Sequence, residues 1–377
     1  MWKVQLFKLN FDSRERDAVV QVIDGGWLTM GEKIASFEAA FGKFLGQDAQ
    51  CSAVSNGTAA LHMALLALDV GPDDEVIIPA LTFVADANVV RLVGAKPILA
   101  DCGSLADWNV SALSIERCIT PRTKAVIVVH YAGFPCEMDA ITKLCRKRGI
   151  RVIEDAAHAP GATASGKSCG TWGDIGCFSF FSNKNLSIGE GGMVSTLDPK
   201  LHQRLRYLRS HGMTTLTLDR HKGRAISYDV AEPGLNCRMD EMRAAIGLVQ
   251  LEKLPAGNKK REELTTLYRE RLAGSKISVP FENIPTGSVS AYHILPVLLP
   301  AGTDRTKVIE ALKAKGIQSS IHYPPFWGFT AFAGQFSPDD APLAAEICQR
   351  ELTLPLYPTM SYEEVDFVSS ALLEALA

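Results

Sequence analysis

The sequence predicts an α/β protein with a mostly parallel sheet and a smaller α+β unit at its C-terminal end. Short apolar runs alternate with segments of helical periodicity between about residues 50 and 200, a pattern typical of strands joined by crossover helices. From about residue 239 this alternation stops and long helical patterns take over. The 377 residues also exceed one typical hydrophobic core, so we expect two domains.

The apolar runs of the first part have the length of strands that are buried on both faces. We assign strands to residues 75–79, 96–100, 124–129 and 151–154, and helices to residues 58–68, 84–93, 111–118 and 137–148. Two further strands, at 177–181 and 193–196, flank a loop around Lys184. Ligands on such sheets bind beyond the carboxyl ends of the strands. Asp155 directly follows one of these strands, so it stands where a functional residue is expected.

The second part has the pattern of an α+β unit. We expect helices at 241–254 and 259–272, a strand at 293–299, and further helices at 306–315, 342–351 and 361–376. This division predicts a large domain over residues 1–250, which includes an N-terminal arm, and a small domain over residues 251–377.

Composition excludes several classes of protein. With 47% hydrophobic residues, 21% charged residues and a net charge of −3, the chain lacks the basic surface expected for binding nucleic acid or an anionic membrane. It has no apolar run of membrane-spanning length and no signal-peptide pattern at its N-terminus. Its nine cysteines include no Cys-x-x-Cys pair, which favours reduced thiols in the cytoplasm and argues against a zinc site.

The most informative feature is a single lysine in an apolar, hydroxyl-rich stretch. Lys184 lies between Cys177 and a run of glycines that ends at Gly192, and Asp155 precedes it by 29 residues. Pyridoxal phosphate (PLP) accounts for both residues, because its aldehyde condenses with a lysine amine and its pyridine nitrogen pairs with a carboxylate. Taken singly, a surface charge and a helix cap are the plainer interpretations; together, the two residues favour PLP.

Other parts of a PLP site can be assigned with less specificity. The helix predicted to begin near Thr58 offers free N–H groups to a phosphate, and Gly57 permits close approach, although Asn-Gly-Thr is also an ordinary helix start. Ser179 could add a hydroxyl. Phe83 could stack on the cofactor ring or lie in the core, and His158 could contact the ring or its phenolic oxygen or be a buried structural histidine.

One motif points to a different chemistry. Residues 161–168 match the Walker A pattern that binds nucleotide phosphates. A P-loop requires a strand before the motif and a helix that opens at Lys167 and Ser168. Two glycines and no helical periodicity follow instead, and Pro160 separates the motif from the preceding strand. We therefore interpret the match as coincidental.

Taken together, the ordered motifs resemble the DegT/DnrJ/EryC1/StrS family of PLP-dependent aminotransferases over nearly the whole chain. The blocks that carry the resemblance are residues 26–31, 55–62, 154–158, 173–180, 184–192, 236–247 and 354–358. The resemblance implies the aspartate-aminotransferase-like fold type I, with a mostly parallel seven-stranded-type sheet in the large, PLP-binding domain. It also implies a homodimer with active sites shared between subunits.

The resemblance assigns roles residue by residue. Lys184 matches the lysine that forms the Schiff base, and Asp155 matches the partner of the pyridine nitrogen. The remaining matches are phosphate contacts at Gly57, Thr58 and Ser179, the stacking position at Phe83, and an asparagine, Asn236, that reaches the phosphate of the neighbouring subunit's cofactor. His158 stands where relatives often have Gln, and Trp327 where they commonly have His. We expect His322, Tyr323 and Trp327 to contact the substrate.

The implied reaction moves an amino group from glutamate or glutamine to a keto sugar, with pyridoxamine phosphate as the form between the two half-reactions. A nucleotide-linked keto-deoxyhexose is the expected acceptor. A cyclitol or another keto acceptor of secondary metabolism is the alternative within the family. A non-catalytic PLP-binding relative is the alternative outside it, and the presence of both Lys184 and Asp155 argues against that alternative.

Overall fold

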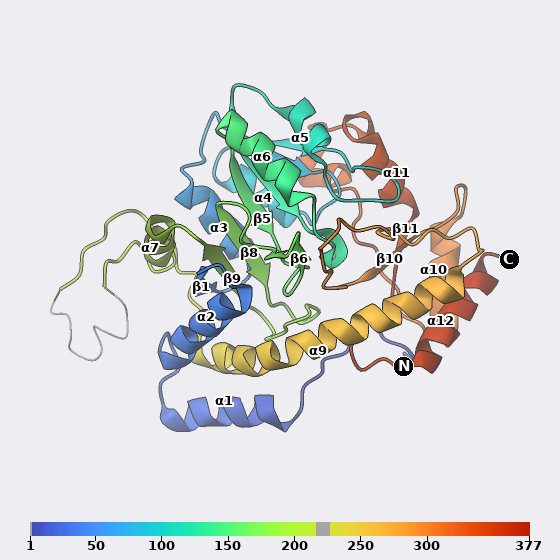
Figure 1. Ribbon diagram of the computed structural model, residues 1–377, viewed down its shortest axis with the longest axis horizontal. Helices are drawn as coiled ribbons and strands as arrows, with labels where there is room; N and C mark the ends of the chain where they lie inside the picture. The colour runs from blue at the N-terminus through green and yellow to red at the C-terminus, as the bar shows by residue number, and fades with distance from the viewer. Residues whose placement is uncertain (1, 216–226) are drawn as a thin grey trace.

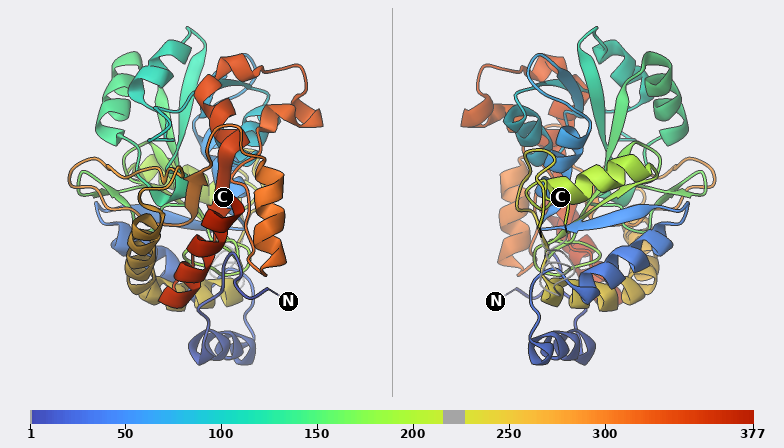
Figure 2. Two further views of the ribbon diagram at one scale, coloured as in Figure 1. Left: turned by 90° about the vertical axis from the view of Figure 1, so that its right-hand side faces the viewer. Right: turned by 90° about the vertical axis from the view of Figure 1, so that its left-hand side faces the viewer.

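The computed structural model describes residues 2–215 and 227–377 of the chain. Its centre is a seven-stranded sheet with helices on both faces, and a second, two-stranded sheet lies near the C-terminal helices (Figures 1 and 2). The strand order of the large sheet is β1 (Gln50–Val54), β9 (Gly192–Thr196), β8 (Ile175–Ser179), β5 (Arg151–Asp155), β4 (Thr123–Val129), β2 (Glu75–Pro79) and β3 (Lys96–Ala100).

The predicted mostly parallel sheet is confirmed. Each neighbouring pair from β8 to β3 is parallel, whereas β9 runs antiparallel to both β1 and β8. The sequence did not predict β1. Its last four residues are buried, but two of them, Cys51 and Ser52, are not typical of an apolar run.

Crossover helices connect the parallel strands as predicted. They are α3 (Gly57–Ala67), α4 (Ala85–Leu92), α5 (Ala112–Cys118) and α6 (Met138–Arg148). Side-chain caps fix two of the starting points: Asn56 accepts a hydrogen bond from the backbone of Ala59 at α3, and Ser111 forms a capping box with Ser114 at α5. Three helices that the sequence analysis did not assign are α1 (Ser13–Gly25), α2 (Glu32–Leu45) and α7 (Pro199–Leu208).

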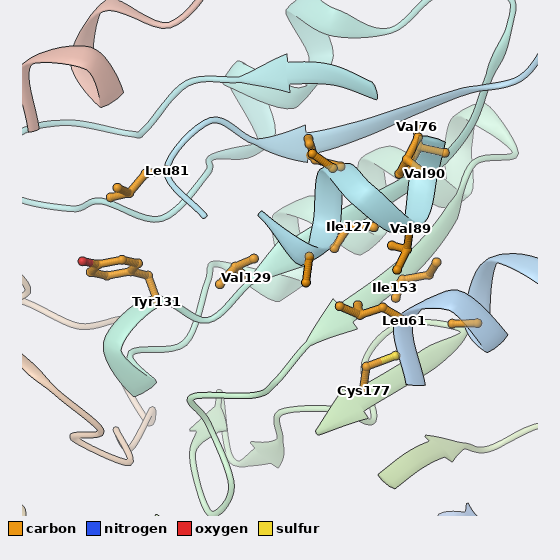
Figure 3. Close-up of a cluster of buried hydrophobic side chains, with 14 of the residues drawn as sticks. Leu61, Val76, Leu81, Val89, Val90, Ile127, Val129, Tyr131, Ile153 and Cys177 are labelled. Atoms are coloured by element: carbon orange, nitrogen blue, oxygen red, sulfur yellow. The ribbon is translucent and has the colours of Figure 1, made fainter. Parts of the chain in front are cut away.

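The largest hydrophobic core lies between the sheet and the helices that include α3 and α4. Figure 3 shows side chains from these helices meeting residues of neighbouring strands, among them Leu61, Val89, Ile127 and Ile153, all at most 3% exposed. Burial on this scale holds the strand ends in fixed relative positions. The carboxyl edge of the sheet, where α3 and α4 begin, is therefore a rigid base for a ligand site.

The prediction of two helices at 241–254 and 259–272 is wrong. The structure has one 32-residue helix, α9 (Glu241–Leu272), with Pro255 inside it. A proline lacks the N–H that the helix would use and usually ends or kinks it, but here the exposed Pro255 is accommodated and the helix continues. In Figure 1, α9 crosses the molecule as one long rod, with α1 beside it; α9 packs against α1, α2 and α12 (Tyr362–Ala375).

The C-terminal part has its own small sheet and core. The antiparallel strands β10 (Leu295–Leu298) and β11 (Glu351–Leu354) accompany α10 (Arg305–Ala314), α11 (Pro342–Arg350) and α12. A separate buried cluster joins the end of α9 to β10, β11, α10 and α12. The buried residues of α11 belong instead to the largest core. The separate cluster agrees with a small C-terminal domain, but the boundary at residue 250 falls inside α9 and stays a prediction.

The Walker-like segment folds as a β-hairpin. Strands β6 (Thr163–Ala164) and β7 (Lys167–Ser168) pair antiparallel, and the two residues between them, Ser165 and Gly166, both have positive φ. Such a pair is typical of a tight hairpin turn. No helix begins at Lys167, so the geometry of a P-loop is absent. Among the described residues, no helix is long and apolar enough to cross a membrane.

Candidate active site

A cavity of about 580 Å³ opens at the carboxyl edge of the large sheet. Its walls come from the start of α3, the segment after β2, the ends of β4, β5 and β8, the loop between β8 and β9, and residues 322–323 of the C-terminal part. The volume lies in the range of small-molecule and cofactor pockets. Nine of the residues predicted for the site line this cavity: Gly57, Thr58, Phe83, Asp155, His158, Ser179, Lys184, His322 and Tyr323.

Lys184 lies in the connection between β8 and β9, residues 180–191. These strands pair so that Ser179 faces Gly192, and both ends of the connection therefore lie at the same edge of the sheet. The backbone N–H of Lys184 donates to the carbonyl of Phe181 at 2.8 Å, which closes a turn. Burial lowers the pKa of Lys184 to about 8, against the opposing effect of the Asp155 carboxylate. An amine with this pKa is available as a nucleophile near neutral pH.

Asp155 is the last residue of β5 and is 8% exposed. Burial raises the pKa of its carboxyl group, while a 2.8 Å hydrogen bond from the backbone of Ala157 and the charges of Lys184 and His130 act in the opposite direction. Only one carboxylate oxygen takes the hydrogen bond from Ala157. The carboxylate thus lines the cavity with capacity for a cationic partner, as a protonated pyridine nitrogen requires.

The predicted phosphate contacts meet at the start of α3. A Cβ atom on Gly57 would come within 2.9 Å of Cβ of Ser179, so the glycine is required by the close approach of this helix to β8. Asn56 caps the helix, and the exposed Thr58 follows Gly57 in its first turn. Free N–H groups and the positive end of the helix dipole there favour an anion.

His158 is almost fully buried, at 4% exposed, and is held at both ring nitrogens. Nδ1 accepts a hydrogen bond from the backbone N–H of Ala132 at 3.2 Å, and Nε2 lies 3.0 Å from the hydroxyl of Tyr323. Burial lowers the pKa of His158 well below its usual value, and the positive charges of Lys184 and His322 add to the effect. The ring is therefore neutral, and because Nδ1 is an acceptor, Nε2 carries the proton and donates to Tyr323.

Phe83 is available for stacking. Its side chain is 52% exposed and lines the cavity, and its ring lies 5.5 Å from that of Tyr323, at 50°. An aromatic ring this exposed next to a cavity is not a core residue, so the structure favours the functional interpretation of Phe83.

Two predicted site residues lie outside this cavity. Trp327 is 7% exposed and belongs to the main hydrophobic core, with its ring 5.6 Å from that of Phe326. The burial of its large indole removes it from the substrate mouth, so the structure does not bring Trp327 to the site. Asn236 is exposed and forms a backbone bridge with Ser210. Its predicted contact with a neighbouring subunit stays a prediction.

The sequence analysis missed several residues around Lys184. Asn183 and Glu190 line the cavity, and Oδ1 of Asn183 is buried without a hydrogen-bond partner. His293, which is 3% exposed, lies with its ring 4.4 Å from that of His158. The signal for Asn183 and Glu190 was their place beside Lys184 and within the glycine run. His293 had no such signal, because it is 109 residues further along the chain than Lys184.

These residues fit PLP. The cavity offers a lysine whose pKa is lowered, a carboxylate opposite it, a helix start that only glycine can bring this close to β8, and an exposed aromatic ring. The buried, unpartnered oxygen of Asn183 adds a hydrogen-bond acceptor that awaits a donor in the cavity.

Comparisons with known proteins agree with this arrangement. Residues 10–373 match the model of the DegT/DnrJ/EryC1/StrS aminotransferase family. The chain is 37% identical over 368 residues to GDP-perosamine synthase from Caulobacter vibrioides, covering 97% of this chain and 96% of that protein. DesV from S. venezuelae, solved in complex with a ketimine intermediate, has a TM-score of 0.90 and 32% identity, with 99% and 98% of the two chains covered. The PLP form of Spr1654 from Streptococcus pneumoniae has a TM-score of 0.89 and 28% identity, with 98% of each chain covered.

Proposed function

The chain belongs to the DegT/DnrJ/EryC1/StrS family of PLP-dependent aminotransferases, and from this premise we propose that it transfers an amino group from glutamate or glutamine to a keto sugar. The observation that carries the proposal is the meeting of Lys184 and Asp155 in one cavity at the carboxyl edge of the sheet. A P-loop nucleotidase does not account for this pair, and its own motif folds as a hairpin without a following helix.

Lys184 moves the proton in this proposal. Its pKa of about 8 leaves part of the amine neutral near pH 7, so Nζ can take a proton from the α-carbon of the amino donor and return it at a neighbouring atom. Two backbone hydrogen bonds within the connection between β8 and β9, from Lys184 to Phe181 and from Ile188 to Phe180, limit the movement of the Lys184 backbone during this transfer.

The other residues hold and polarise the cofactor. When bound, PLP supplies an aldehyde for the amine and a pyridine ring that withdraws electrons from the reacting carbon. Asp155 would pair with the pyridine nitrogen and keep it protonated, the N–H groups of Gly57 and Thr58 with the hydroxyl of Ser179 would hold the phosphate, and Phe83 would stack on the ring. His158 acts through Tyr323, whose own hydroxyl hydrogen is left free for a group in the cavity because its oxygen accepts from His158.

We propose a nucleotide-linked keto-deoxyhexose as the acceptor. Support comes from GDP-perosamine synthase, whose name contains a nucleoside diphosphate and an amino sugar, and from a relative named for spore coat polysaccharide biosynthesis, SpsC of Bacillus subtilis, at 37% identity. Neither name favours a cyclitol acceptor.

A homodimer with shared active sites and a cytoplasmic location are part of the same proposal. Asn236 is exposed and lies outside the cavity of its own chain, as a residue that serves a neighbouring subunit would. Large apolar side chains near the N-terminus, including Val20, Ile23 and Leu28, are each about half exposed, and a second subunit would cover them. The nine cysteines are all unpaired, in agreement with a reducing compartment.

The first experiment is a visible absorption spectrum of the purified protein with added PLP, recorded before and after excess glutamate and, separately, glutamine. We expect a visible band of the bound cofactor that disappears with at least one donor, and loss of this response in Lys184→Ala. The protein left in the amino form of the cofactor is then mixed with a panel of keto-deoxyhexoses carried on different nucleotides, and the return of the band identifies the acceptor.

Each outcome decides a different part of the proposal. A protein that never takes up PLP contradicts the assignment of the cavity. A protein that binds PLP and ignores both donors contradicts the assignment of the donor. Return of the band with a cyclitol ketone, and with no member of the sugar panel, contradicts the assignment of the acceptor.

A further inference from the structure

His322 is held by residues of two elements, the strand β11 and the turn at Tyr131–Gly133. Its backbone N–H donates to Oε2 of Glu351 at 2.8 Å, and its carbonyl accepts a hydrogen bond from the hydroxyl of Tyr131. Its ring atom Nδ1 lies 2.8 Å from Oγ1 of Thr353. Within the described part of the chain, Nε2 is the one polar atom of His322 that forms no hydrogen bond. His322 also lines the cavity that contains Lys184.

The direction of these hydrogen bonds determines which ring nitrogen carries the proton. Oγ1 of Thr353 also contacts Oε1 of Glu351. An ionised carboxylate can only accept, so the hydroxyl hydrogen of Thr353 points to Glu351. Oγ1 then has only lone pairs to offer to His322, and Nδ1 must be the donor. In a neutral imidazole the other nitrogen, Nε2, is left without a hydrogen and acts as an acceptor.

Burial supports a neutral ring and a single arrangement of the network. Glu351 and Thr353 are 0% exposed, and His322 is 8% exposed. Burial lowers the pKa of His322 to about 3, and the nearby Lys184 charge contributes to the shift. A buried polar network of this kind has few alternatives, because each unsatisfied group would cost free energy.

We propose that Thr353 and Glu351 are positioning residues that hold His322 with an unprotonated Nε2, and that this atom accepts a hydrogen bond from a hydroxyl of the bound sugar. The inference rests on the proposed function in one respect, the sugar as substrate. If the direction of the network were reversed, Nε2 would carry a hydrogen and act as a donor, and the sugar hydroxyl would have to turn its own hydrogen away and accept instead. Glu351 and Thr353 would thus contribute to specificity without touching the substrate.

The network also has a predicted pH dependence. Burial raises the pKa of Glu351 to about 7, while the hydrogen bonds from Thr353 and the His322 backbone and the charge of Arg305 favour its ionised form. Above this pH the carboxylate accepts from Thr353 and His322 keeps the Nδ1–H form. Below it, a protonated Glu351 donates to Thr353, Thr353 donates to Nδ1, and the proton of His322 moves to Nε2. The other titratable groups near the network are Tyr131, Tyr323, Cys348, His158, His293 and Lys184.

The test is the tautomer of His322 in the full-length protein, measured by long-range proton–nitrogen correlation NMR with ¹⁵N-labelled histidine. Signals that disappear in His322→Gln identify the residue. We expect the Nδ1–H form of the neutral ring at pH 8.5 and a change toward Nε2–H as the pH falls below 7. An Nε2–H form at pH 8.5 in the wild-type protein would overturn the proposal, and this result needs no variant other than the one used for assignment.

Substitutions at Glu351 and Thr353 test the direction of the network. In Glu351→Gln, the amide oxygen must accept from the His322 backbone N–H, so the amide NH₂ faces Thr353 and should reverse the network to the Nε2–H form at all pH values. Thr353→Val, of the same shape, should give a mixture of tautomers, and Thr353→Ser should restore the wild-type form. An unchanged tautomer in folded Glu351→Gln would contradict the proposal.

Kinetics then connect the tautomer to the substrate. With the best acceptor of the sugar panel, Glu351→Gln should raise KM about five- to tenfold, and Thr353→Ser should stay within about twofold of wild type. The glutamate half-reaction should change by less than about twofold in both variants. A reversed tautomer with an unchanged acceptor KM would overturn the hydroxyl contact. Failure of the proposed function would instead appear as absent amino transfer, with the NMR result intact.

Discussion

Two effects act in opposite directions on the pKa of Lys184 in the protein without cofactor, and their balance sets the reactivity of the lysine. Burial favours the neutral amine, whereas the Asp155 carboxylate favours the ammonium form. The resulting pKa of about 8 is lower than that of an ordinary lysine but is still above neutral pH. Nζ can therefore exist in either form within the physiological range, which suits a group that both accepts and returns a proton.

This balance predicts a pH dependence in the protein without cofactor. The rate at which an amine reagent modifies Lys184, followed by peptide mass spectrometry, should rise with pH to a half-maximum near pH 8. Asp155→Asn removes the charge that raises the pKa of Lys184, so the half-maximum should move to lower pH. An exposed lysine such as Lys307 in the same digest serves as the control. A shift to higher pH in Asp155→Asn would contradict the assigned interaction.

Gly57 allows a second prediction at the scale of single residues. Gly57→Ala should weaken PLP binding at least about tenfold, because the new Cβ meets Cβ of Ser179 at 2.9 Å and moves the start of α3. Fluorescence titration of the protein with PLP gives the Kd. Ser179→Gly alone should weaken PLP binding through the loss of its hydroxyl, and adding Gly57→Ala to that variant should cost less than it does in the wild type, because the Cβ contact is gone. Gly71→Ala, where no atom lies within 4 Å of the new Cβ, is the matched control and should bind PLP like the wild type.

The sequence predicted the residues of the site that follow local rules. Asp155 ends a buried strand, Gly57 precedes a capped helix and Lys184 lies in a glycine-rich connection, and each signal fits within a few neighbouring residues. The contacts of His322 could not be predicted, because Glu351 and Thr353 are 29 and 31 residues away and reach it only through the fold. Trp327 is buried and does not line the cavity. A large indole gains much free energy from burial, and its position in the sequence did not show which way it faces.

At the scale of elements, the sequence identified strands better than it identified long helices. The runs that became β2 to β5 are continuous and apolar, so they had one interpretation. The helical patterns on either side of Pro255 could belong to one helix or to two. Proline usually ends a helix, so the sequence analysis assigned two helices, but α9 continues through Pro255. The helices α1 and α2 are held largely by packing on α9, and this tertiary support is invisible in their own residues.

The β6–β7 hairpin allows a prediction that separates the two phosphate-binding motifs. Lys167→Ala should keep PLP content and amino transfer within about twofold of the wild type, because Lys167 does not line the cavity. The amine of Lys167 lies 4.9 Å from the centre of the Trp172 ring, so loss of this cation–π contact should lower the free energy of unfolding by about 1 kcal/mol or less. Calorimetric titration with ATP should show no binding in either protein. ATP binding that Lys167→Ala abolishes would contradict the hairpin interpretation.

At the scale of the whole molecule, the predicted shared active site can be tested by mixing two inactive proteins. Lys184→Ala and Asn236→Ala should each be impaired as homodimers. A mixed dimer has one site that carries both substitutions and one that carries neither, if Asn236 serves the partner's cofactor. Equal amounts, unfolded and refolded together or co-expressed, should recover about a quarter of the wild-type sites.

The readout of the mixing experiment is amino transfer compared with the sum of the two separate proteins. Mixing Lys184→Ala with Asp155→Asn is the control. Both residues belong to the cavity of one chain, and no subunit in this mixture carries both wild-type residues, so no complete site can form. Activity equal to the sum in the first mixture would contradict the contact of Asn236 with a second subunit.

The order of strands in the large sheet has a consequence for how the protein is synthesised. Among the described strands, β1 pairs with β9 alone, so the segment that leads into Gly57 cannot join the sheet until residues 192–196 have been made. The two sides of the proposed phosphate site, Gly57 and Ser179, thus come together only after more than half of the chain has left the ribosome. Before that point the growing chain exposes an unpaired strand and offers the cofactor no complete pocket.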